Sequence, residues 1–147
     1  MIETINYWDE KAFLWLNSFH LEALDPVALQ LTQTITWIPL YVLLLYLIYR
    51  IDSKNTLWIL GGVMLTILLA DQVSSGLMKP YFERLRPCHD PRWEGMMHVY
   101  GRCGGLYGFV SSHAANTFGL ATFLTLKLGK KQKAIAWLFL YALVVSY

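Results

Sequence analysis

The sequence carries four long blocks of apolar residues, and these blocks limit the folds that it can adopt. A helix needs roughly 20 predominantly apolar residues to cross the hydrocarbon layer of a membrane. Three blocks reach or approach that length, at about residues 26–49, 57–78 and 109–128, and a fourth covers residues 134–147. Only 15% of the residues are charged, which is low for a soluble domain. The sequence therefore predicts one domain over residues 1–147, an all-α bundle of helices that crosses a membrane several times.

The two ends of the chain depart from this pattern. Residues 2–20 mix apolar and charged side chains and include Trp8 and Trp15, which is typical of an interfacial helix lying in the headgroup layer. A helix packed on the protein surface fits the same residues. The block at residues 134–147 is too short to cross a bilayer. We therefore expect an incomplete span there, and we expect the chain to be the N-terminal portion of a longer protein.

Short turns rich in cations follow the first and third blocks. Arg50 and Lys54 lie in one turn and four lysines lie at residues 127–133 in the other, so both turns are predicted to be cytoplasmic. The loop between the second and third blocks then faces outside. It holds five cations, Lys79, Arg84, Arg86, Arg92 and Arg102. Cations are disfavoured on that side, so we expect the loop to bind anions. The net charge of +2 gives no reason to expect a nucleic-acid partner.

Two of these cations, Lys79 and Arg86, have a spacing that suits a shared ligand. Pro80 disfavours helix at Lys79, which predicts that the second span ends there and that a short helix runs from Pro80 to Pro87. On that helix Lys79 and Arg86 are two turns apart on one face, about 10 Å along the axis. Their long side chains could converge on one phosphate group. The alternative is that they bind lipid headgroups at the membrane surface.

The other end of the loop is rich in glycine and runs into Ser111, Ser112 and His113, which precede an apolar helix. Backbone N–H groups at a helix N-terminus bind anions, and either serine can cap the helix. His113 in the first turn could exchange a proton with a bound anion. The alternative is a histidine with a structural role only. In combination with the two cations, these residues predict a phosphate site.

The pattern K-x6-R-P at residues 79–87, followed by S-S-H at residues 111–113, resembles the type 2 phosphatidic acid phosphatase (PAP2) superfamily. Members of that family carry three motifs, K-x6-R-P, P-S-G-H and S-R-x5-H-x3-D, on outward-facing loops of a helical bundle. The first motif is matched in full. The second is matched in part, because Val110 stands in place of proline and Ser112 in place of glycine. The third has no match in residues 1–147, and we expect it to follow them.

The resemblance implies a role for each matched residue. Lys79 and Arg86 would clamp the phosphate, while Ser111 and the Ser112 amide would hold its oxygens. His113 would be the general acid that protonates the leaving alkoxide. The third motif would supply a phosphate-binding arginine, the histidine nucleophile that becomes phosphorylated, and the aspartate that orients it.

The distribution of cations predicts an active site that faces the periplasm or the outside, and the compact size and oxidisable outer loop favour a bacterial inner membrane. The resemblance implies an enzyme that acts on lipids. The enzyme would hydrolyse a phosphomonoester or pyrophosphate of a lipid, of the undecaprenyl pyrophosphate, phosphatidylglycerophosphate or lipid A type. The reaction would pass through a phosphohistidine and need no metal or cofactor. The partners would be the lipid substrate and the bilayer.

Two other functions fit parts of the sequence. One is a membrane protein that binds lipid phosphates without hydrolysing them. The other is a small scaffold or transporter subunit in which Asp71, a carboxylate inside the second span, is the functional group. Asp71 could equally support the phosphate site through a hydrogen bond, because Ser75 lies between it and Lys79 on one helical face.

Cys88 and Cys103 are the only cysteines, and both lie in the outer loop. An oxidising compartment would favour a disulfide between them. The alternative is a zinc site that uses both cysteines with His89 and His98. The adjacency of Cys88 and His89 is poor spacing for a metal site, so the disulfide is the favoured prediction.

Overall fold

The structure is a computed structural model that describes residues 2–101 and 103–146. The described residues form helices and loops without any strand. The α-helices are α1 (Ile2–Asn17), α2 (Asp25–Leu31), α3 (Ile38–Ile51), α4 (Thr56–Asp71), α5 (Lys79–Phe82), α6 (Ser112–Leu128) and α7 (Leu138–Ser146). The prediction of an all-α bundle is thereby confirmed.

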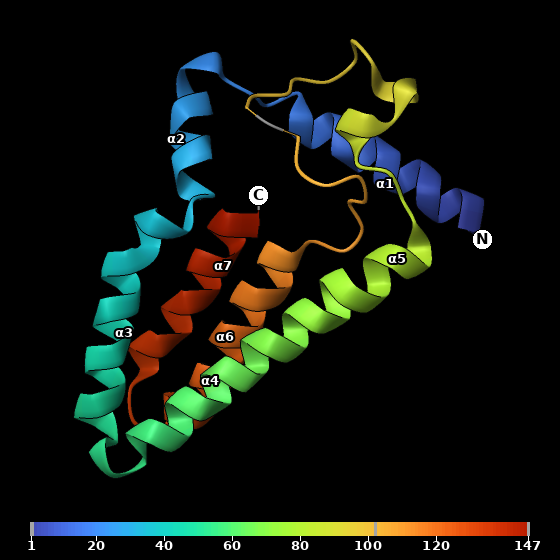
Figure 1. Ribbon diagram of the computed structural model, residues 1–147. Coiled ribbons are helices and arrows are strands. Elements are labelled where there is room, and N and C mark those ends of the chain that lie inside the picture. The colour runs from blue at the N-terminus through green and yellow to red at the C-terminus, as the bar shows by residue number, and fades with distance from the viewer. Residues whose placement is uncertain (1, 102, 147) are drawn as a thin grey trace.

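Four of the helices, α3, α4, α6 and α7, lie side by side and enclose the apolar core (Figure 1). Leu124 and Leu128 of α6 are almost completely buried at its centre. Helix α6 packs against α4 through a small residue, because a side chain at Gly62 would collide with the ring of Phe123. Small residues let transmembrane helices approach closely, so this contact suits a bundle in a bilayer.

Among the described residues, two helical segments are long and apolar enough to cross a membrane, Thr34–Ile51 and Ser53–Phe82. The turns after α3 and α6 lie at the same end of the bundle, where Lys131 donates a hydrogen bond to Asp52 at 2.7 Å. That ion pair places both predicted cytoplasmic turns on one side. The loop between α5 and α6 lies at the opposite end (Figure 1).

The span predicted over residues 26–49 is divided into two helices, which corrects its bounds. Helix α2 ends at Leu31, a 3₁₀ turn follows at Thr34–Trp37, and α3 begins at Ile38. Pro39 has no N–H to continue a helix from the preceding turn, and it sits instead in the first turn of α3. The carbonyls at the end of α2 are bonded by side chains of the turn: Thr36 Oγ1 donates to Gln30 at 2.6 Å and Trp37 Nε1 donates to Leu31 at 2.7 Å.

The other predicted spans also differ in their bounds. The second extends beyond residue 78, since a π-helical segment, Gln72–Met78, leads directly into α5. Pro80 has no N–H to donate to a carbonyl of the preceding helical turn. The wider π-helical turns lie directly before it. The third span begins at Ser112 rather than at residue 109. The fourth starts as a 3₁₀ turn, Lys133–Trp137, before α7.

Helix α1 lies at the end of the bundle beside the outer loop (Figure 1). Its acidic residues form ion pairs with that loop, Asp9 with Arg84 and Glu10 with Arg92. Trp8 and Trp15 are 65% and 62% exposed. Helix α1 is therefore packed on the protein along one side and presents aromatic rings along another. Its insertion into the headgroup layer stays a prediction.

Candidate active site

The two ends of the outer loop meet in a short antiparallel pairing at the mouth of the bundle. Arg86 N–H donates to the Leu106 carbonyl at 2.9 Å, and Gly108 N–H donates to the Arg84 carbonyl at 2.9 Å. An isolated bridge joins Leu85 and Tyr107 between these bonds. The pairing holds the segment after α5 against the segment before α6, and so brings the two sequence motifs together.

The predicted helix from Pro80 to Pro87 is wrong. Helix α5 ends at Phe82, and Glu83 adopts a left-handed backbone with φ 44° that turns the chain away. Arg86 then lies in extended backbone outside any helix. Lys79 and Arg86 therefore do not share a helical face. They line the same cavity because the loop pairing holds Arg86 against the segment before the N-terminus of α6.

Arg86 is held by backbone groups on two sides. Its Nε donates to the Tyr107 carbonyl at 3.2 Å. A Cβ at Gly104 would lie 2.5 Å from Arg86 Nη1, and a Cβ at Gly108 would lie 2.8 Å from Arg86 Cγ. The guanidinium fits only because both positions are glycine. The Nη groups have no hydrogen-bond partner among the described residues, and so keep their donors for a ligand.

Lys79 is connected to Asp71 by a chain of hydroxyl groups. Lys79 Nζ donates to Ser112 Oγ at 2.7 Å, and Ser112 is hydrogen-bonded to Ser75 Oγ at 2.6 Å. Ser75 in turn donates to Asp71 Oδ1 at 3.3 Å. Since the Ser75 proton goes to the carboxylate, Ser112 donates to Ser75. The carboxylate thus lies at the far end of a network that fixes the lysine ammonium at the start of α6.

The N-terminus of α6 carries the remaining predicted residues. Ser111 is the capping residue, since its Oγ accepts from Ala114 N–H at 3.3 Å. Ser112 is the first residue of α6 and His113 the second. Thr117 Oγ1 donates to the His113 carbonyl at 2.7 Å. Within the described part of the chain the exposed His113 imidazole has no hydrogen-bond partner, so it is available to exchange a proton with a ligand.

A cavity of about 570 Å³ lies at this mouth of the bundle. All five predicted residues of the phosphate site line it, Lys79, Arg86, Ser111, Ser112 and His113. Two cationic side chains and one helix N-terminus therefore face a single space, which is the arrangement that binds a phosphate group. The cavity is also lined by α1 and by residues 97–100, which the sequence did not indicate.

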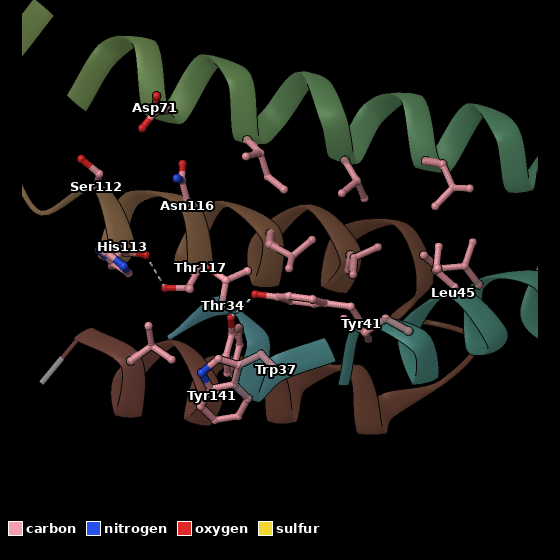
Figure 2. A pocket seen from close by; sticks show the side chains of 18 of the residues that line it. Thr34, Trp37, Tyr41, Leu45, Asp71, Ser112, His113, Asn116, Thr117 and Tyr141 are labelled. Atoms are coloured by element: carbon pink, nitrogen blue, oxygen red, sulfur yellow. Dashed lines mark hydrogen bonds between the residues drawn. The ribbon is translucent and has the colours of Figure 1, made fainter. Parts of the chain in front are cut away.

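A second cavity, of about 590 Å³, runs between α3, α4, α6 and α7 (Figure 2). Its walls are mostly apolar, and Tyr41 and Tyr141 cross it with their hydroxyls 3.0 Å apart. Its polar end holds Asp71, Ser112 and His113, and the Asn116 Oδ1 there is buried without a hydrogen-bond partner among the described residues. Ser112 and His113 thus lie between the two cavities.

Arg84 and Arg92 do not line the phosphate cavity. Arg84 pairs with Asp9, and Arg92 bonds Asp90 at 2.7 Å as well as Glu10 at 3.1 Å. The hydrogen bonds from Arg92 hold the pKa of the Asp90 carboxyl below its usual range. Arg84 and Arg92 therefore attach α1 to the loop. Arg102, which was expected to act with them, lies outside the described residues.

A disulfide joins Cys88 and Cys103, whose Cα atoms are 6.2 Å apart. His89 lies beside it, with Nε2 donating to the Gly104 carbonyl at 3.0 Å, and the ligand atoms of this histidine and the two cysteines lie within 4.8 Å of one another. His98 is elsewhere and donates through Nε2 to Asp25 at 2.7 Å. The four residues of the alternative zinc site are therefore divided between two places.

Comparison with known proteins adds independent findings. The family model described as the PAP2 superfamily matches residues 56–147. The chain is 38% identical to a lipid A 4'-phosphatase of Porphyromonas gingivalis over 117 residues, 78% of this chain and 50% of the relative. It is 35% identical to a lipid A 4'-phosphatase of Bacteroides thetaiotaomicron over 150 residues, 100% of this chain and 66% of the relative. The chain spans about half to two thirds of the length of these curated relatives. No solved structure matches.

Proposed function

Because this chain belongs to the PAP2 superfamily, we propose that it acts in the hydrolysis of a phosphomonoester or pyrophosphate of a membrane lipid. The observation that carries the proposal is the cavity of about 570 Å³ at the end of the bundle, where Lys79, Arg86 and the N-terminus of α6 face one space. A phosphate there would remain beside the bilayer while the lipid tail stays within it. The family membership and this geometry support the same class of reaction.

The phosphate would be bound mainly by charge. The Arg86 guanidinium offers its Nη groups to two phosphate oxygens, and Lys79 adds a point charge from the other side. The free N–H groups at the start of α6, between Ser111 and His113, complete the set of donors. In phosphoryl transfer such positioned donors stabilise the charge on the equatorial oxygens, which is the main requirement of the transition state.

His113 would supply the proton for the leaving group. The bond between phosphorus and the lipid oxygen breaks as a nucleophile bonds to phosphorus, and the protonated imidazole transfers its proton to the departing alkoxide. Neutral His113 then takes a proton from the water that attacks the phosphorylated nucleophile, and inorganic phosphate leaves. In the family the nucleophile is a histidine of the third motif, which has no match in residues 1–147. The phosphohistidine is therefore part of the proposal.

The substrate that the relatives favour is lipid A phosphorylated at the 4' position, since that is what both are named for. We place the protein in a bacterial inner membrane with this site facing the periplasm. Lysines and arginines at the opposite end of the bundle support that orientation. Undecaprenyl pyrophosphate and phosphatidylglycerophosphate belong in the same test because they present similar phosphate groups at a membrane surface.

The test is phosphate release from these three lipids by the full-length protein in detergent micelles with EDTA present. Release that persists in EDTA and falls by about 10²- to 10⁴-fold in His113→Ala would support general acid catalysis by this residue. A matched control is His89→Ala, since His89 lies in the same loop but outside the phosphate cavity. Binding of the lipids without any release would replace the phosphatase proposal with a non-catalytic binding function.

A further inference from the structure

Part of the wall of the phosphate cavity comes from outside the region that matches the family. That region begins at residue 56, whereas Phe13 and Asn17 of α1 line the same cavity as the phosphate-binding residues. The cavity volume of about 570 Å³ is in the range that accommodates drug-sized ligands and exceeds what one phosphate group requires. Part of this space is therefore available to whatever carries the phosphate.

The second part of the wall is the loop segment 97–100, which contributes Met97, His98, Val99 and Tyr100. Asn17 fixes this segment to the end of α1 by two reciprocal bonds: its Nδ2 donates to the His98 carbonyl at 3.0 Å, and its Oδ1 accepts from His98 N–H at 2.8 Å. The His98 ring also bonds Asp25 and stacks on His20, with ring centroids 4.2 Å apart. The segment is therefore held in place against α1 and α2.

Helix α1 itself is fixed to the loop at several points along its length. Asp9 and Glu10 pair with Arg84 and Arg92, and the Phe13 ring packs edge-on against Trp93 with centroids 6.0 Å apart. A wall anchored in this way is pre-organised, so that a ligand that fits it loses little ordering free energy on binding. The same cavity is thus lined by cations and by aromatic and apolar side chains beside a few polar groups.

We propose that Phe13 and Tyr100 form a headgroup-selecting wall that recognises a sugar ring attached to the phosphate. A pyranose has an apolar face of C–H groups and a rim of hydroxyls, which matches an aromatic surface with polar neighbours. A glycerol phosphate has no such ring face to offer to the aromatic side chains. This inference rests on the proposed function in that the phosphate occupies the site of Lys79 and Arg86, but it concerns binding rather than hydrolysis.

The experiment measures Kd by calorimetry on the full-length protein in detergent micelles, with soluble glucosamine 4-phosphate, glycerol 3-phosphate and inorganic phosphate as probes. The wild type should bind the sugar phosphate about 10-fold more tightly than the other two, and Phe13→Ala should remove most of that preference without changing the Kd for inorganic phosphate. Tyr100→Ala should do the same from the other side of the wall. Trp15→Ala is the matched control, because Trp15 lies on α1 but does not line the cavity.

Phe13→Leu separates recognition from folding, since leucine keeps apolar packing against Trp93 but has no ring. Loss of the sugar preference in Phe13→Leu, at an unchanged melting temperature, would support the wall. Equal affinities of the wild type for all three probes would overturn it, as would a parallel loss of phosphate binding in both wall variants. Phosphate release from the lipid panel is measured on the same samples. A protein that prefers the sugar phosphate but releases nothing would contradict the proposed hydrolysis and leave the wall supported.

Discussion

Lys79 Nζ and Ser112 Oγ are 2.7 Å apart although 33 residues separate them in the sequence. The bond joins the first residue of α5 to the first residue of α6, and both residues line the phosphate cavity. Ser112 stands where the family has glycine, and its hydroxyl lies between the lysine ammonium and Ser75. The hydroxyl thus fixes the position of the charge that is proposed to bind phosphate.

Ser112→Ala should weaken phosphate binding without preventing folding. The substitution removes a hydrogen bond to a charged group, worth roughly 1.5 to 3 kcal/mol, although Lys79 keeps part of this by finding water or the phosphate itself. We expect Kd for orthovanadate, a phosphate analogue, to rise about 3- to 10-fold. Ser111→Ala, by contrast, removes the cap of α6 and should lower the free energy of unfolding by about 1 kcal/mol. An unchanged Kd in Ser112→Ala would mean that the hydroxyl does not position Lys79.

The glycines beside Arg86 offer a test of its placement. A Cβ at Gly104 would lie 2.5 Å from Arg86 Nη1 and 3.0 Å from Cζ, whereas a Cβ at Gly105 meets nothing within 4 Å. Gly104→Ala should therefore displace the guanidinium and raise Kd for orthovanadate about 10-fold, because a two-donor contact with the anion is lost. Gly105→Ala should leave Kd unchanged. Melting temperatures of both variants are measured alongside, and equal Kd values for the two would contradict the placement of Arg86.

Much of this fold could be predicted from the sequence, because apolar block length is a direct requirement of the bilayer. The break in the first block does not follow from its length or from its lack of charge. Pro39 is the residue that marks it in the sequence. The reversal at Glu83 carries no sequence signal, because glutamate gives no indication of a left-handed backbone. The position of Lys79 and Arg86 at one cavity therefore could not be derived from helical spacing.

The residues of the site also fall into those that could be predicted from the sequence and those that could not. The phosphate-binding residues could be identified because phosphate needs cations and free N–H groups, and these residue types are visible in the sequence. The wall formed by Phe13 and Tyr100 could not, since contacts between α1 and the loop depend on tertiary pairing. The acidic residues of α1 and the unexplained cations Arg84 and Arg92 were the available signal, because their ion pairs join the two segments.

The ion pair between Asp52 and Lys131 predicts a pH-dependent contribution to stability. The hydrogen bond from Lys131 lowers the pKa of the Asp52 carboxyl below its ordinary value of 3.8. When the pKa of a carboxyl is lower in the folded chain than in the unfolded chain, the ionised carboxylate stabilises the fold at any pH above its pKa in the unfolded chain. This stabilisation is lost as the pH falls through the pKa of the carboxyl in the folded chain. The melting temperature of Asp52→Asn should therefore be below that of the wild type at pH 7, and the two should converge as the pH falls well below 3.8. A difference that persists at acid pH would contradict the ion-pair explanation.

The last prediction concerns the disulfide, which connects the two chain segments that hold Arg86. Cys88 follows Arg86 by two residues, and Cys103 precedes Gly104, which contacts the guanidinium. The double variant Cys88→Ser with Cys103→Ser should lose about 3 kcal/mol of stability, the chain-entropy value for a loop near 15 residues. It should also raise Kd for orthovanadate, because the loop pairing beside Arg86 becomes less ordered.

Treatment of the wild type with a reductant should reproduce both effects, and the same reductant should leave the double variant unchanged. Loss of stability with unaltered Kd would show that the disulfide supports the fold but does not position Arg86.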